Sequence, residues 1–199
     1  EEESELCFND EVGILPGSLS AGEIIDRLSS FKDRAHELSD EVVNVMALME
    51  NVQVSKLFIS SRKELSQSYI WSQGYLYVVA RRNKRTKYSM KGFSGLKGLE
   101  VLDEMEAFVG KVVENARLLL SAERIDPGEY DVICSPDVAG LIAHEAFGHG
   151  VEMDMFVKGR AKAVEYLGKH VASELVTMHD GAAGVREVSS YAFDDEGSL

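Results

Sequence analysis

Cysteine is scarce in this sequence, which has only Cys7 and Cys134 among its 199 residues. The two lie far apart and form no CxxC pair, so the sequence predicts neither a disulfide framework nor a structural zinc knuckle. Cysteines that form no disulfide are typical of proteins in a reducing compartment, and we therefore expect a cytoplasmic protein.

Basic residues are also in the minority, with 21 Lys and Arg against 34 Asp and Glu, which gives a net charge of -13. This excess of negative charge opposes a broad surface for nucleic acid or anionic lipid, so we expect no nucleic-acid partner. The only concentrated basic run is Arg81–Lys87. We interpret it as a solvent-exposed hairpin tip, and contact with an acidic partner remains an alternative.

Long apolar runs are missing as well. No window approaches the roughly eighteen continuous apolar residues that a membrane-spanning helix needs, so no membrane association is expected. The sequence starts at Glu1 rather than at Met, and its acidic beginning is the reverse of the basic start of a signal peptide. We expect a fragment or a shortened form of a longer protein.

Apolar residues nevertheless make up 45% of the chain, which is enough for a sizeable core. The sequence divides into three regions. Residues 1–19 are an acidic lead-in, residues 20–128 form a helix-strands-helix region, and residues 129–199 are the metal-motif region, expected to be the start of a longer C-terminal domain.

Hydrophobic periodicity predicts the elements of these regions. Helices are expected at 20–50, where Ser20 and Glu23 form a capping box, at 99–122, and after the cap residue Ser135. Strands are expected at 53–59, 66–71, 75–80 and 130–134. A turn is expected at Gln73-Gly74 and a flexible connection at 92–98. Cys134 is expected to be buried at the end of its strand. The predicted fold class is α+β, with long helices packed on an antiparallel sheet and a short helix carrying a metal motif.

That motif is His144-Glu145-Ala146-Phe147-Gly148-His149, inside an otherwise apolar run. Imidazole is the commonest protein ligand for zinc, and a glutamate beside it can take a proton from water. The histidines are five positions apart, about 140° around a regular helix, so both reach one ion only if the helix carries a π-bulge or ends between them. Gly148 and Gly150 make such a distortion inexpensive. The alternative is two ordinary buried histidines.

The residues from His144 to Glu152 resemble the HExxxH signature of the TldD/PmbA family, also called the modulator-of-DNA-gyrase family. The resemblance extends to Val171–Thr177 and Asp194–Gly197, which are similar to family segments downstream of the metal helix. It is close over about residues 130–197 and weak before them. Glu152 follows the motif closely enough to be a hydrogen-bonding partner that orients an imidazole.

The resemblance implies a zinc-dependent metallopeptidase of the TldD type that hydrolyses unstructured peptides. His144 and His149 would bind Zn²⁺ and Glu145 would be the catalytic base. It also implies a dimer with a PmbA-like or identical subunit. The family's third protein ligand is a cysteine near the C-terminus of a much longer chain, and nothing here corresponds to it, since Cys7 and Cys134 both precede the motif.

The second hypothesis belongs to another class. The chain could be a non-catalytic binding or scaffold relative, a truncated family member that lacks the third metal ligand and offers its surface to a partner without turnover. Zinc content after purification, compared with that of His144→Ala, separates the two hypotheses.

Overall fold

The computed structural model describes residues 4–182 and 184–199. Residues 1–3 of the predicted acidic lead-in lie outside the described residues. The chain forms two compact units, one containing the residues up to Arg124 together with Val185–Leu199, the other Ile125–Gly184. This division differs from the predicted one, because the last fifteen residues pack with the first unit and not with the metal-motif region.

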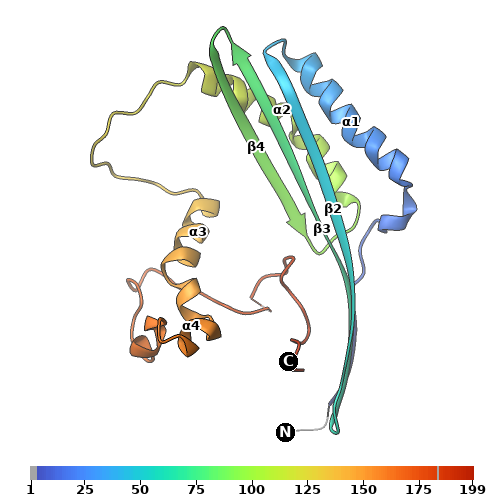
Figure 1. Cartoon of the computed structure of the whole chain (residues 1–199), viewed down its shortest axis with the longest axis vertical. Coiled ribbons are helices and arrows are strands. Elements are labelled where there is room, and N and C mark those ends of the chain that lie inside the picture. Colours follow the sequence, from blue (N-terminus) through green and yellow to red (C-terminus); the bar gives the residue numbers. More distant parts are fainter. Residues whose placement is uncertain (1–3, 183) are drawn as a thin grey trace. The chain divides into compact units, whose positions relative to one another are not determined.

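The first unit is a mixed α and β structure built on a four-stranded sheet (Figure 1). Its strands are β1 (Ser4–Asn9), β2 (Val42–Ile59), β3 (Lys63–Arg82) and β4 (Arg85–Gly95). The central strand is β3, which pairs antiparallel with β2 along one edge. Its other edge pairs antiparallel with β4 in its second part and parallel with β1 in its first part. Neither β1 nor a parallel pairing was predicted from the sequence.

The helix α1 (Ala21–Leu38) begins at Ser20, whose side chain accepts a hydrogen bond from the backbone N–H of Glu23 in the predicted capping box. The prediction that this helix continues to about residue 50 was wrong. The chain turns at Asp40 and Glu41, and the residues from Val42 onward join β2. Valines at 42, 43 and 45 favour this outcome, because β-branched side chains fit a pleated strand better than a helix.

The strands β3 and β4 form a hairpin whose two-residue turn is Asn83-Lys84, with Asn83 at φ 56°. The predicted exposed hairpin tip at Arg81–Lys87 is therefore confirmed.

The predicted turn at Gln73-Gly74 was wrong, since β3 continues through it. Position 74 requires glycine because α2 (Glu100–Ser121) packs closely against it: a Cβ there would lie 2.5 Å from Met105 Sδ. The predicted flexible link at 92–98 also begins inside β4.

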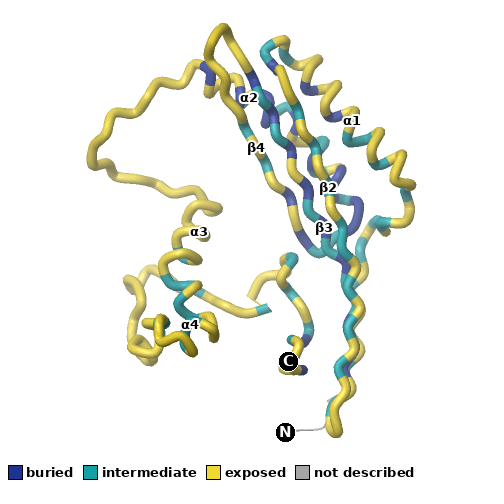
Figure 2. The backbone as a smooth tube through the Cα atoms, in the orientation of Figure 1, coloured by how far each residue is buried: buried dark blue, intermediate teal, exposed yellow. Residues whose placement is uncertain are grey.

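One face of the sheet, called here the helix face, is covered by α1 and α2. The alternating residues Leu76, Val78 and Ala80 of β3 lie on it and are fully buried against α2 residues such as Leu102 and Met105. Figure 2 shows these buried positions concentrated between the helices and the strands. The intervening residues of each strand point to the opposite face of the sheet, called here the open face.

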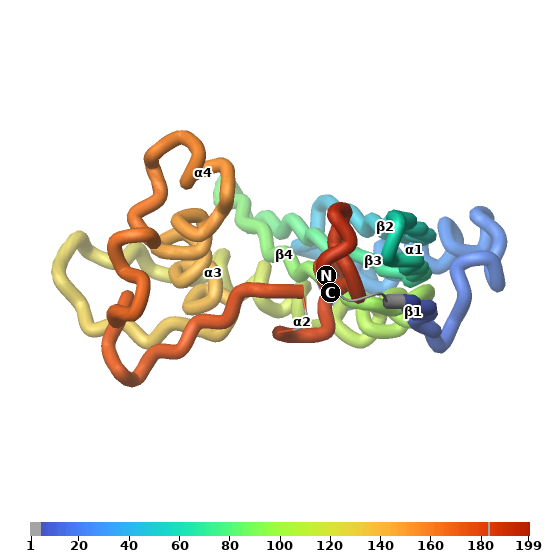
Figure 3. The backbone as a smooth tube through the Cα atoms, turned by 90° about the horizontal axis from the view of Figure 1, so that it is seen from below, coloured from blue at the N-terminus to red at the C-terminus, as the bar shows by residue number. Residues whose placement is uncertain are grey.

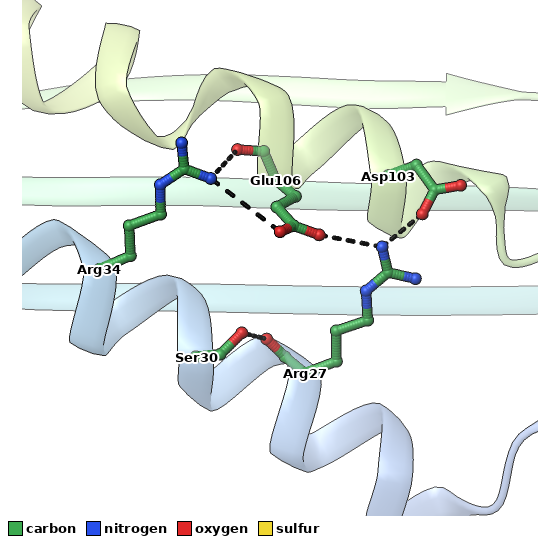
Figure 4. A network of polar contacts seen from close by, with 5 residues as sticks. All are labelled: Arg27, Ser30, Arg34, Asp103 and Glu106. Carbon is green, nitrogen blue, oxygen red and sulfur yellow. Dashed lines mark hydrogen bonds and ion pairs between the residues drawn. The ribbon is translucent and has the colours of Figure 1, made fainter.

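The two helices are joined to each other by ion pairs at their surface (Figure 4). Arg27 of α1 contacts Asp103 and Glu106 of α2, with 3.0 Å between its Nη2 and a Glu106 carboxylate oxygen. Arg34, two turns further along α1, donates to the Glu106 backbone carbonyl at 3.4 Å. The network links the two helices along their solvent-exposed side.

The segment Val185–Leu199 returns to the sheet unit and packs where β1 pairs with β3; its red trace can be followed in Figure 3. Phe193 is 1% exposed there. The buried Gln67 side chain is fully used, because its Nε2 donates to the Phe193 carbonyl and its Oε1 accepts from Ala192 N–H, both at 2.8 Å. Lys56 of β2 pairs with Asp195 at 2.5 Å.

The second unit contains the short helices α3 (Pro136–Ala146), η2 (Gly148–Val151), α4 (Met153–Val157) and η3 (Lys162–Tyr166). Residues 130–134 are not a strand, and Cys134 is exposed, so both predictions for that segment were wrong. A segment of five residues is too short to form a stable strand without a neighbour, and no described strand pairs with it. None of the helices in the described part of the chain is long and apolar enough to cross a membrane.

Candidate metal site

The predicted helix after Ser135 is present as α3. Ser135 is its N-cap residue and Pro136 occupies the first turn, where a missing N–H costs nothing. The first helical hydrogen bond runs from Ala139 N–H to the Ser135 carbonyl at 2.8 Å. The helix carries His144 and Glu145 in its last turn.

The helix ends between the two histidines. Phe147 leaves the α-helical region with φ -140° and ψ -28°, and the chain continues as the 3₁₀ turn η2, which contains His149. A hydrogen bond from Gly150 N–H to the Phe147 carbonyl, 2.8 Å long, closes that turn. The His144 and His149 rings consequently lie 4.4 Å apart between centroids, with an interplanar angle of 66°. Of the two distortions predicted from the five-residue spacing, the helix end is the one observed.

The predicted role of the glycines in this distortion was wrong. Neither Gly148 nor Gly150 has a positive φ, so the backbone angles are ones that any residue can adopt. A Cβ on Gly148 would lie at ordinary contact distance, 3.6 Å, from His144 Nδ1, and one on Gly150 would meet nothing within 4 Å. The change of direction depends on Phe147 instead.

The side chains of His144, Glu145 and His149 form a compact cluster. One possible ligand atom from each lies within 4.8 Å of the others, and in the described part of the chain this is the only such group of three or more His, Cys, Asp or Glu residues. Ligands of a tetrahedral zinc ion with bonds of about 2.05 Å are about 3.4 Å apart. Small side-chain rotations would bring these three to that spacing, and two nitrogens with one oxygen are a donor set that zinc accepts.

The two nitrogens of His149 face different partners. Nδ1 lies 2.8 Å from Glu152 Oε1, and Nε2 lies 3.8 Å from Glu145 Oε2. A carboxylate only accepts hydrogen bonds, so the proton of the neutral ring belongs on Nδ1 and the lone pair of Nε2 points toward Glu145. The hydrogen bond to an imidazole predicted for Glu152 is therefore present.

The cluster is open to solvent. The side chains of His149 and Glu145 are 46% and 62% exposed, and His144 is exposed as well. The alternative of two buried histidines that serve the core is therefore wrong. The apolar run around the motif is not core either, since Leu141 and Ile142 are more than half exposed.

Other candidate residues lie outside the cluster. Neither Cys7 nor Cys134 belongs to it, and both are exposed. His170 and His179 lie in segments without helix or strand and take no part either. The cluster itself is formed by residues that the sequence motif had already singled out.

This geometry defines a class: a chain with two exposed imidazoles and a carboxylate at the end of a helix, close enough together that they could hold a metal ion. The family comparison is more specific. Residues 127–199 match the model of the PmbA/TldA metallopeptidase C-terminal domain, so the predicted resemblance to the TldD/PmbA family is confirmed.

The chain is also similar to curated proteins, among them one that matches it over most of its length. A protein named metalloprotease from Methanothermobacter thermautotrophicus is 28% identical over 186 residues, which cover 92% of this chain and 40% of that protein. A metalloprotease TldD homolog from Buchnera aphidicola is 36% identical over 44% of this chain and 18% of that protein. A zinc metalloprotease TldD homolog from Saccharolobus solfataricus is 37% identical over 35% of this chain and 16% of that protein. The chain thus spans at most about two fifths of the length of these relatives.

Proposed function

We propose that the chain is part of a zinc-dependent metallopeptidase of the TldD type that hydrolyses unstructured peptides. The observation that carries this proposal is the cluster of His144, Glu145 and His149, within 4.8 Å of one another. It lies within the region that matches the metallopeptidase family domain. The name of the Saccharolobus relative supports zinc as the metal.

In this proposal His144 and His149 hold the zinc ion through ring nitrogens. When bound, zinc supplies a positive charge that polarises a peptide carbonyl and lowers the pKa of water. Glu145 accepts the proton of the attacking water and passes it to the leaving amine, so that a C–O bond forms as the C–N bond breaks. Glu152 is a positioning residue that holds the His149 ring through Nδ1.

The exposure of the site supports the choice of substrate. An extended peptide can approach the half-exposed side chains of Glu145 and His149 from solvent, whereas a folded protein cannot present its backbone in this way. We further propose a cytoplasmic location, supported by two unpaired cysteines. A dimer with a PmbA-like or identical subunit completes the proposal.

The test is zinc content after purification without added metal. We expect about one zinc ion per chain in the wild type and none in His144→Ala or His149→Ala. His36→Ala is the matched control, because His36 lies in α1 outside the cluster, and it should keep the metal. A wild-type chain that stays free of zinc even after incubation with the metal contradicts the proposal.

Glu145→Gln separates binding from chemistry. It should retain zinc, since the histidines are intact, and lose peptide hydrolysis by about 10²- to 10⁴-fold, because the amide cannot accept the proton. Cleavage of a fluorogenic unstructured peptide, followed with wild type and variant in parallel, measures this loss. Equal rates in the two proteins would remove Glu145 from the role of base.

A second candidate function, a non-catalytic binding or scaffold relative, is favoured by one observation. The cluster offers two histidines and Glu145, so when Glu145 acts as base only two ligands remain. Catalytic zinc sites ordinarily use three protein ligands. Zinc that binds only weakly, together with peptide binding and no cleavage, would support the scaffold and contradict the enzyme.

A further inference from the structure

The open face of the sheet carries an apolar strip on three neighbouring strands. We define the tyrosine-methionine strip as Met46 and Leu48 of β2, Tyr75 and Tyr77 of β3, and Tyr88 and Met90 of β4. Met46, Tyr77 and Met90 lie directly opposite one another in the strand register. The rings of Tyr77 and Tyr88 stack with 5.0 Å between centroids. The strip is therefore one continuous surface.

This surface is exposed although it is apolar. Met46, Tyr88 and Met90 are 53%, 58% and 59% exposed, whereas Leu76 and Val78, on the helix face of the same strand pair, are fully buried. Contiguous apolar surface of this kind marks interaction sites, and tyrosine and methionine are enriched in protein interfaces. Methionine also adapts its shape to different partners.

The hairpin tip places positive charge at one end of the strip. Arg82 pairs with Glu41, and Arg85 donates to the Ala122 carbonyl. Arg81 and Lys84 are exposed, and within residues 4–182 and 184–199 no acidic group pairs with them. A partner that fits this end must carry negative charge.

The same face shows elsewhere how it receives such a segment. Lys56 lies on the open face, since its register partner is Gln67, ten residues before Tyr77 and therefore on the same side of β3. There the chain's own segment from Tyr191 to Glu196 buries Phe193 and pairs Asp195 with Lys56. The Lys56 ammonium lies 5.8 Å from the centroids of the Tyr191 and Phe193 rings. Aromatic anchors followed by carboxylates thus match a basic and apolar sheet surface.

We propose that the tyrosine-methionine strip binds an extended segment of a partner protein in which apolar residues alternate with acidic ones. Alternate side chains of an extended segment point to opposite sides, so its apolar residues pack on the strip. Its flanking carboxylates reach Arg81, which lies on the open face opposite Thr86, and Lys84 in the turn. The proposal does not depend on the metal site.

Two fluorescein-labelled synthetic decapeptides test this recognition. In one, Phe and Leu alternate with Asp and Glu; in the other, Lys replaces every Asp and Glu. Fluorescence anisotropy with the full chain, in EDTA so that no cleavage occurs, should show binding of the acidic peptide at least about tenfold tighter than that of the basic peptide. The affinity for the acidic peptide should fall as salt is raised.

Matched variants locate the binding surface. Met90→Ser and Lys84→Glu should each weaken the acidic peptide about three- to tenfold. Leu57→Ser and Lys32→Glu are the controls, because Leu57 is an exposed residue on the other face of β2 and Lys32 lies on α1; both should bind as the wild type does. Circular dichroism establishes that all four variants are folded.

Equal binding of the two peptides, no binding, or binding insensitive to Met90→Ser and Lys84→Glu overturns the proposal. Sedimentation velocity tests the other possible occupant of the strip, a second copy of this chain. If the wild type self-associates, binds neither peptide and becomes monomeric with Met90→Ser, the strip is an interface between copies of this chain, and the proposal is wrong.

Discussion

At the scale of single residues, the site depends on which nitrogen of His149 is left free. The contact between Nδ1 and Glu152 leaves Nε2 toward Glu145, the side on which the cluster closes. Glu152 touches no substrate in the proposed mechanism. Its effect is to remove the ring orientations in which Nε2 would face away from the metal.

Replacement of Glu152 by alanine should weaken zinc binding about 10- to 100-fold, because the ring loses the partner that fixes its proton and orientation. Competition with a chromogenic chelator measures the affinity. Asp154→Ala is the matched control, since among the described residues Asp154 of the short helix α4 forms an ion pair with Lys158 alone, at 2.5 Å. Equal zinc affinity in Glu152→Ala and the wild type would show that the contact does not position the ring.

At the scale of elements, Glu41 links the junction of α1 and β2 to β3 and α2. It lies between α1 and β2, and its carboxylate accepts hydrogen bonds from Arg82 at the end of β3 and Arg117 in α2. These bonds, above all that from Arg82, lower the pKa of Glu41 from 4.5 to about 2. The ionised form is therefore the one that stabilises the junction.

The sign of the pH dependence follows from this lowered pKa. The contribution of Glu41 to stability should be complete above about pH 4.5 and be lost as the pH falls from there toward about 2. Glu41→Gln should unfold at a lower temperature than the wild type at pH 7, and the gap should close as acid is added. Thermal unfolding from pH 7 to pH 3 measures it. Glu37→Gln, an exposed change on α1, is the control, and a gap that stays constant to pH 3 would contradict the prediction.

Elements with a long, unambiguous period were predictable. The helix expected at 99–122 is α2, because eight of its apolar residues recur at helical spacing and all are buried. Residues 42–50 were misread because the apolar positions 42, 45, 46 and 49 also fit a helical repeat. These residues form a strand because they pair with β3. A pairing between residues far apart in the sequence cannot be recognised from the local hydrophobic pattern. The short strand β1 was missed for the same reason.

The candidate site was predictable in its residues and only partly in its geometry. The sequence identified His144, Glu145 and His149, and it required a distortion between the histidines. The position of that distortion, at Phe147, could not be read from the sequence. Glycines are the usual indication of unusual backbone angles, and here they have ordinary ones.

At the scale of the whole molecule, the two candidate sites belong to different units. The cluster of His144, Glu145 and His149 lies entirely within Ile125–Gly184, and the tyrosine-methionine strip lies in the sheet unit. The last segment of the chain belongs to the sheet unit, although it lies within the family domain matched at 127–199. The family domain therefore contributes to both units.

Phe193→Ala should separate the two units experimentally. It removes a buried ring from the sheet unit and should lower the free energy of unfolding by about 3 kcal/mol, as for other large core truncations. Urea unfolding measures the change. Zinc content should stay at the wild-type value, because no residue of the cluster is involved. Leu199→Ala, 75% exposed, is the control and should change stability by less than about 0.5 kcal/mol. Parallel loss of zinc would show that the units are coupled.

The hydrogen bonds of Gln67 also set an order of events during synthesis. Its two partners, Ala192 and Phe193, follow it by 125 and 126 residues. The part of the β2–β3 ribbon around Gln67 therefore stays uncovered until residues 185–199 have left the ribosome, while α1, α2 and the rest of the sheet can already assemble. A nascent chain stalled before residue 185 should expose this part of the ribbon to chaperones, and emergence of residues 185–199 should end that exposure.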